Sequence, residues 1–119
     1  SYLMLGYNVF AAPTDAEARL LASSMQQAFI AIRTGRSVRL QPPIENFEAT
    51  LGPSELSLLA QTLDRSAIGS PETVGRTLEE FVSKTGADEV MIASQIYDHD
   101  LRKRCYAITA EVVGMTALV

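Results

Sequence analysis

Several residue types that mark particular protein classes are scarce in this sequence. Its 119 residues contain one cysteine, one histidine and no tryptophan, and only 7% are aromatic. A single cysteine excludes an intrachain disulfide and fits a reducing compartment, so we expect a cytoplasmic protein. Because the histidine has no second imidazole or thiolate at ligand spacing, we expect no metal site.

Long hydrophobic runs and an excess of basic charge are missing too. No apolar run approaches the length of a membrane span, and we expect no membrane association. Ten basic and fourteen acidic residues give a net charge of −4 and a pI of about 4.9. Such a balance argues against a nucleic-acid partner. The remaining composition, 47% hydrophobic and 20% charged residues, is that of an ordinary globular domain.

Residues 67–92 predict a βαβ unit. A short apolar strand leads into a helix that starts at Ser70, with Pro71 at its first position, and ends at Gly86. One face of this helix is apolar at helical spacing, with Val74, Leu78, Phe81 and Val82. A second apolar strand follows at residues 90–93. Two strands joined by one helix are expected to be parallel in one sheet, with a right-handed crossover.

The beginning of the chain predicts another buried strand. Residues 3–12 are almost all apolar without alternation, which is typical of a central parallel strand covered on both faces. Because a domain rarely starts with such a strand, we expect further sequence upstream of Ser1. Thr14 and Glu17 then have the spacing of a capping box, so a long helix should start here and end near Gly35.

The remaining segments complete a β-α-loop-α-β-α-β-α order. Residues 37–52 contain adjacent prolines and no clear period, which predicts a long, mobile loop that acts as a lid. A shorter helix should follow Gly52, and the last helix should begin near Asp98. The last helix has one apolar stripe, formed by Leu101, Cys105, Ile108, Val112 and Met115. Three strands neither close a barrel nor make a balanced open sheet, so residues 1–119 are predicted to be a single partial domain.

Motifs along the whole chain occur in a characteristic order. They are the strand and helix start at residues 4–18, Ile-Gly-Ser-Pro-Glu-Thr-Val at residues 68–74, Thr-Gly-Ala-Asp-Glu at residues 85–89, and Ser-Gln-Ile-Tyr-Asp-His at residues 94–99. Together they resemble the bacterial luciferase-like, flavin-dependent monooxygenases, over only the C-terminal third of such an enzyme. The resemblance implies an α/β fold: the C-terminal fragment of a TIM (β/α)8 barrel, with about three parallel strands and four helices.

The resemblance also implies a chemistry. Members of this family bind reduced FMN, or deazaflavin in some relatives, at the C-terminal ends of the barrel strands and oxidise a small organic substrate with oxygen. Most phosphate contacts and the usual catalytic groups come from earlier strands, so this chain alone is expected to be inactive. The alternative is a small oligomeric α/β module for binding or assembly, whose resemblance to the family is only topological.

Binding groups of parallel sheets gather where strands end, which identifies Gly69, Ser70, Ser94 and Gln95 as candidate cofactor-binding residues. Free amides at the helix start after Gly69 could bind an anion, although Ser70 also suits an ordinary N-cap. Ser94 and Gln95 could face the cofactor or could cap the last helix or the sheet edge.

Other reactive side chains have simpler interpretations. His99 lies between Asp98 and Asp100, but consecutive helical residues do not share a face, and acidic groups are common at helix starts. Cys105 is expected to be a buried core thiol. The basic run at residues 102–104 is expected to be solvated or paired with Asp98 and Asp100.

The sheet itself predicts association. In a three-stranded sheet, the strands at residues 3–12 and 90–93 would each expose an unpaired edge. We therefore expect a homo-oligomer, or association with the missing N-terminal part of the protein.

Overall fold

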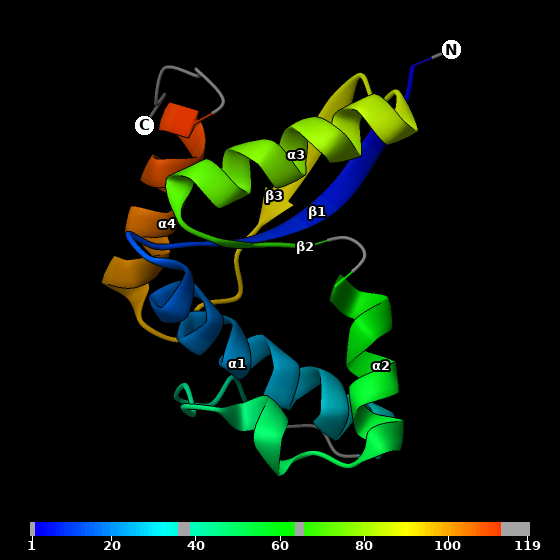
Figure 1. Cartoon of the computed structure of the whole chain (residues 1–119), viewed down its shortest axis with the longest axis vertical. Helices are drawn as coiled ribbons and strands as arrows, with labels where there is room; N and C mark the ends of the chain where they lie inside the picture. Colours follow the sequence, from blue (N-terminus) through cyan, green and yellow to red (C-terminus); the bar gives the residue numbers. More distant parts are fainter. Residues whose placement is uncertain (1, 36–38, 64–65, 113–119) are drawn as a thin grey trace.

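The computed structural model describes residues 2–35, 39–63 and 66–112. Figure 1 shows the elements in chain order: β1 (Met4–Ala11), α1 (Asp15–Arg33), the 3-10 helix η1 (Phe47–Thr50), α2 (Pro53–Leu63), β2 (Ser66–Gly69), α3 (Pro71–Thr85), β3 (Glu89–Ala93) and α4 (His99–Val112). The predicted fold class, three parallel strands with four α-helices, is confirmed.

The sheet has the order β2-β1-β3, with β1 in the centre. The first half of β1 pairs with β3, from Met4 opposite Glu89 to Asn8 opposite Ala93. Its second half pairs with β2, as far as Ala11 opposite Gly69. The prediction that the first strand lies at an edge is therefore wrong, and the edge strands are β2 and β3. At eight residues, β1 is long enough to pair with two shorter strands along different halves.

Local capping signals set the helix ends. The Thr14 side chain accepts a hydrogen bond from the Glu17 backbone N–H at 3.2 Å, as the capping-box spacing predicts. Ser70 caps α3 and Pro71 follows at the first helical position. Gly86 ends α3 with φ +68°, a left-handed conformation that glycine adopts without steric cost.

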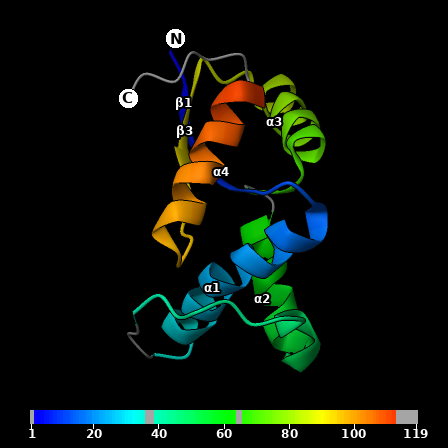
Figure 2. The same ribbon diagram turned by 90° about the vertical axis from the view of Figure 1, so that its left-hand side faces the viewer.

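The segment predicted to be a lid runs along α1 (Figure 2). It contains the short helix η1, which the sequence did not indicate, and its first two residues lie outside the described part. Gln27 of α1 donates to the Pro42 carbonyl at 2.9 Å, and the Ile44 N–H donates to the Ser23 hydroxyl at 2.8 Å. These bonds hold the segment on α1, and its mobility stays a prediction.

The two faces of the sheet are covered unequally. Helices α3 and α4 lie on one side of β1 and β3 (Figure 2), where Tyr7 contacts the Phe81 ring at 4.3 Å between centroids. On the opposite side, Met4 is 49% exposed and Met91 is 62% exposed. The prediction that the first strand is covered on both faces is right for its carboxyl half, where Phe10 joins the core beside Leu21 of α1. It is wrong for its amino half.

Candidate functional site

The carboxyl ends of three parallel strands meet at one edge of the sheet. The first turn of α1 follows β1 there, the first turn of α3 follows β2, and a short segment after β3 leads into α4 (Figure 1). All four predicted site residues lie at this edge. Gly69 and Ser70 join β2 to α3, and Ser94 and Gln95 follow β3.

Exposed and more buried residues alternate along β3 and beyond it. Exposed residues occupy every second position, at Glu89, Met91, Ala93, Gln95 and Tyr97. The residues between them are half-buried or buried, at Val90, Ile92, Ser94 and Ile96. Beyond the end of β3, the Ile96 N–H donates to the Ser94 carbonyl at 3.0 Å, and in this tight turn Ser94 is buried whereas Gln95 is exposed.

Exposed residues of β1 and β3, with the half-buried Asn8, form one surface. The strand register places Met4 opposite Glu89, Gly6 opposite Met91 and Asn8 opposite Ala93. We call these six residues, together with Gln95, the open face. Met4, Met91 and Ala93 give this surface its apolar side chains, and polar side chains lie at its two ends, Glu89 at one and Asn8 and Gln95 at the other.

Two free amides lie at the carboxyl end of the open face. The side chains of Asn8 and Gln95 make no hydrogen bond to any residue that the structure describes. Asn8 is half-buried and Gln95 is exposed. Asn8 was missed from sequence, although it is the one amide in an otherwise apolar strand.

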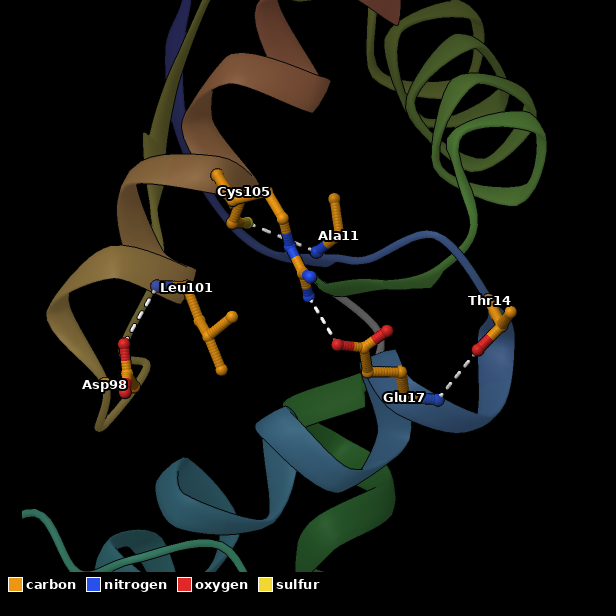
Figure 3. Close-up of polar contacts among 7 residues, drawn as sticks. Ala11, Thr14, Glu17, Asp98, Leu101 and Cys105 are labelled. Carbon is orange, nitrogen blue, oxygen red and sulfur yellow. Dashed lines mark hydrogen bonds and ion pairs between the residues drawn. The ribbon is translucent and has the colours of Figure 1, made fainter.

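Ser94 contributes to the packing of the covered face. Its hydroxyl donates to the Val9 carbonyl at 2.7 Å. The Ala11 N–H donates to the Cys105 sulfur at 3.2 Å, as Figure 3 shows. These side chains satisfy the backbone of β1 beyond Asn8, where its pairing with β3 ends. Cys105 is fully buried in the core, as predicted.

The turn between β2 and α3 is occupied by a carboxylate from α1. The Ser70 N–H donates to Asp15 Oδ1 at 2.7 Å, and the Thr73 hydroxyl donates to the same oxygen at 2.9 Å. These two bonds, the Ser70 bond foremost, lower the pKa of Asp15 from its usual value. A Cβ on Gly69 would lie 2.6 Å from this oxygen, so only glycine allows the contact. Asp15 was missed because its partner is distant in sequence.

The basic run of α4 has different partners from those predicted. Arg104 forms an ion pair with Glu17 of α1 at 2.6 Å, whereas the sequence predicted a solvated side chain or a pair with Asp98 and Asp100. Asp98 instead caps α4, because its carboxylate accepts the Leu101 N–H at 3.0 Å (Figure 3).

The single histidine, His99, lies beside an arginine and not beside a carboxylate. The His99 ring lies 2.8 Å from the Arg102 guanidinium, and both residues are in the first turn of α4. In the described part of the chain, no group of three His, Cys, Asp or Glu residues could hold a metal ion. None of the described helices is long and apolar enough to cross a membrane.

Comparisons with known proteins agree with this architecture. No protein-family model matches the sequence. A luciferase-like monooxygenase of Escherichia coli K12 is 36% identical over 111 residues, which are 93% of this chain and 33% of that protein. The uncharacterized protein YvbT of Bacillus subtilis shows the same identity and the same coverage. The chain thus spans about a third of the length of the curated relatives it matches.

A solved structure shares the fold. The crystal structure of apo-MsnO8 matches with a TM-score of 0.72 and 24% identity, over 97% of this chain and 35% of that chain. Three parallel strands with four helices, matching a third of longer chains, are consistent with part of a (β/α)8 barrel. The predicted resemblance to the luciferase-like monooxygenases is therefore confirmed, over about a third of the length of these relatives.

Proposed function

We propose that this chain is the C-terminal third of an FMN-dependent, luciferase-like monooxygenase that oxidises a small organic substrate with oxygen. We further propose that the chain alone is inactive and that the parent protein is cytoplasmic. The observation that carries the proposal is the open face: an apolar surface on one side of a parallel sheet, with two free amides at its carboxyl end.

The open face has the properties of an inner barrel wall. In a closed barrel, each strand has one side under the helices and the other toward the interior. Here α3 and α4 cover one side, and Met4 and Met91 are exposed on the other. Further strands would pair with the free edge of β3 and enclose these apolar side chains.

The carboxyl end of the open face fits part of a flavin ring. Each amide of Asn8 and Gln95 offers both donors and an acceptor, which suits the polar edge of a planar heteroaromatic ring. When bound, the reduced flavin supplies the electrons that activate oxygen. The two amides orient the ring, and the apolar residues beside them exclude water from it.

The other three predicted residues act at the same edge in a different way. The backbone N–H of Ser70 bonds Asp15, and the hydroxyl of Ser94 bonds Val9. Gly69 makes room for the Asp15 carboxylate. We therefore propose that Gly69, Ser70 and Ser94 shape the wall of the cofactor site, and that Gln95 contacts the cofactor directly.

Ligands for the flavin phosphate come from the rest of the parent protein in this proposal. At the carboxyl edge, Arg104 is paired with Glu17, and the N–H of Ser70, the N-cap residue of α3, is bonded to Asp15. These groups are therefore engaged within the chain. A site with a ring edge and no phosphate ligand binds flavin poorly, which is the physical reason for expecting an inactive fragment.

Flavin titration tests the proposal. The longer parent protein should bind FMN, and the 119-residue chain should show no binding at concentrations that saturate the parent. Gln95→Ala in the parent should weaken binding, whereas Lys103→Ala, an exposed position on α4, should not. Tight binding by the chain alone would contradict the missing phosphate ligands, and no binding by the parent would contradict the use of FMN.

Association follows from the same surface. We propose that the isolated chain covers its open face with a second copy, unless the N-terminal part of the parent is supplied. Size-exclusion chromatography should show a species larger than one chain that shifts when the N-terminal part is added. A monodisperse monomer at all concentrations would contradict this and would weaken the alternative of an oligomeric binding module as well.

A further inference from the structure

The central strand β1 has a neighbour along each edge, but over different lengths. On the side of β3, pairing starts at Met4, and the Leu3 carbonyl just before it accepts the Glu89 N–H at 3.1 Å. On the side of β2, pairing runs only from Asn8 to Ala11. Within the described part of the chain, the amino half of β1 therefore has one paired edge and one unpaired edge.

The alternation of the backbone shows which groups lie along the unpaired edge. In a parallel ladder, the N–H and C=O groups of successive residues point to opposite edges of the strand. Leu3 bonds to β3, and the Ala12 N–H donates to the Gly69 carbonyl of β2 at 3.2 Å. Odd-numbered residues of β1 thus face β3, and even-numbered residues face β2. The backbone groups of Met4 and Gly6, both exposed residues, therefore point to an edge beside which no described strand lies.

This edge lacks the features that protect free strand edges. Natural sheet edges are usually short or carry charged residues or proline, which hinder pairing with another strand. The two outer strands follow this rule, because β2 has four residues and β3 begins with the exposed Glu89. Residues 3–12, in contrast, contain no charged residue and no proline. The amino half of β1 is therefore suited to accept a partner strand.

We propose that the edge at Met4 and Gly6 binds a parallel strand from the N-terminal part of the parent protein, and that β2 stops this strand before Asn8. The inference rests on the proposed function and names a partner for one end of the fragment. The chain covers 33% of each of the two relatives, so further strands are expected outside it. Both neighbours of β1 are parallel, and a parallel strand continues this sheet.

The position of β2 determines the register of the partner strand. Because β2 already pairs with Asn8 through Ala11, only the amino half of β1 is left for pairing on this side. The partner strand should be apolar, since its side chains would lie beside Met4 on one face of the sheet and beside the buried Tyr7 on the other.

Amide hydrogen exchange tests the proposal on unmodified protein. In the dilute chain, the Gly6 amide should exchange rapidly, whereas the Tyr7 amide, which faces β3, should be protected. In the parent, the rapid exchange of Gly6 should be lost, because a carbonyl of the partner strand accepts its N–H. Rapid exchange of Gly6 in both proteins would overturn the proposal, and slow exchange in both would overturn it as well.

The dependence on concentration separates the parent strand from a second copy of this chain. If protection of Gly6 in the chain alone rises with concentration to the level of the parent, a second copy pairs with this edge and the proposal is wrong. Backbone NOEs in the parent should join Met4 and Gly6 to a strand outside this chain, while residues 8–11 keep their NOEs to β2. A parent strand beside residues 8–11 in place of β2 would contradict the stop.

Two substitutions at one position isolate the contribution of the amide. Gly6→Pro eliminates the N–H and Gly6→Ala retains it, and nothing lies within 4 Å of a Cβ at this position. The two variants should differ little in stability in the isolated chain. In the parent, Gly6→Pro should lower the melting temperature far more than Gly6→Ala, and equal effects would overturn the proposal.

These measurements are independent of flavin and so distinguish the partner strand from the proposed cofactor. A parent protein in which Gly6 is protected but FMN does not bind would contradict the use of FMN and support the partner strand. A parent protein that binds FMN with an unprotected Gly6 would contradict the partner strand alone.

Discussion

The covered and open faces of the sheet are built from alternate residues of the same strands, yet only the covered face is packed against helices and has its polar groups hydrogen-bonded. On the covered face, Ser94 and Cys105 satisfy backbone groups of β1, and α3 and α4 pack against this strand. On the open face, the amides of Asn8 and Gln95 have no described partner, and Met91 is exposed. The difference supports the proposal that the open face is an inner barrel wall, which further strands of the parent protein would enclose.

The largest difference in stability between the two faces should come from truncating one apolar side chain on each face of the sheet. Leu78→Ala, on α3 against the core, should cost about 2–5 kcal/mol, because the cavity persists among packed neighbours. Met91→Ala on the open face should change stability by less than about 0.5 kcal/mol. Urea unfolding of dilute protein measures both. A large cost for Met91→Ala would show that the open face is already covered.

A smaller contrast comes from adding one methyl group to a glycine. Gly69→Ala should cost about 1–3 kcal/mol, because its Cβ would meet Asp15 and Thr73 at 2.6 Å. Gly6→Ala should be nearly neutral, since nothing lies within 4 Å of its Cβ position. Thermal unfolding of the two variants compares them directly. Equal losses of stability in the two variants would contradict the close packing at Gly69 and the free space at Gly6.

The smallest contrast compares two neighbours in sequence. Ser94→Ala should cost about 1–2 kcal/mol, because the buried Val9 carbonyl loses its short hydrogen bond. Gln95→Ala should stay within about 0.5 kcal/mol in the isolated chain, since the amide has no partner to lose. The midpoints of denaturant unfolding measure the stability change of both variants, provided that the m-value stays constant. If Gln95→Ala is the more damaging change, the assignment of faces is wrong.

Local signals explain why the elements could be predicted. Thr14, Ser70 and Gly86 act within a few residues of themselves, so their roles as helix ends are visible in the sequence. The apolar periods of the helices and the continuous apolar strands have the same local character. The number and type of the strands and α-helices were therefore predictable without a structure, whereas the 3-10 helix η1 was not.

Contacts between distant residues were not predictable in the same way. The central position of β1 depends on two strands that are distant in sequence, and the bond from Ser70 to Asp15 spans 55 residues. Gln95 and Ser94 were correctly placed at the carboxyl edge, but only the structure shows that Ser94 is buried and Gln95 is exposed. Arg104 pairs with Glu17 because α4 lies opposite the first turn of α1 in the folded chain. The spacing of charged residues along the sequence does not predict this arrangement.

Accessibility of the open face tests the central claim most directly. Met91→Cys can be labelled with a thiol reagent in the dilute 119-residue chain and in the longer parent protein, with the buried Cys105 as an internal unreactive reference. We predict rapid labelling at position 91 in the chain and strong protection in the parent, where other barrel strands enclose this surface. Equally rapid labelling in both proteins would contradict the claim that the open face is an inner barrel wall.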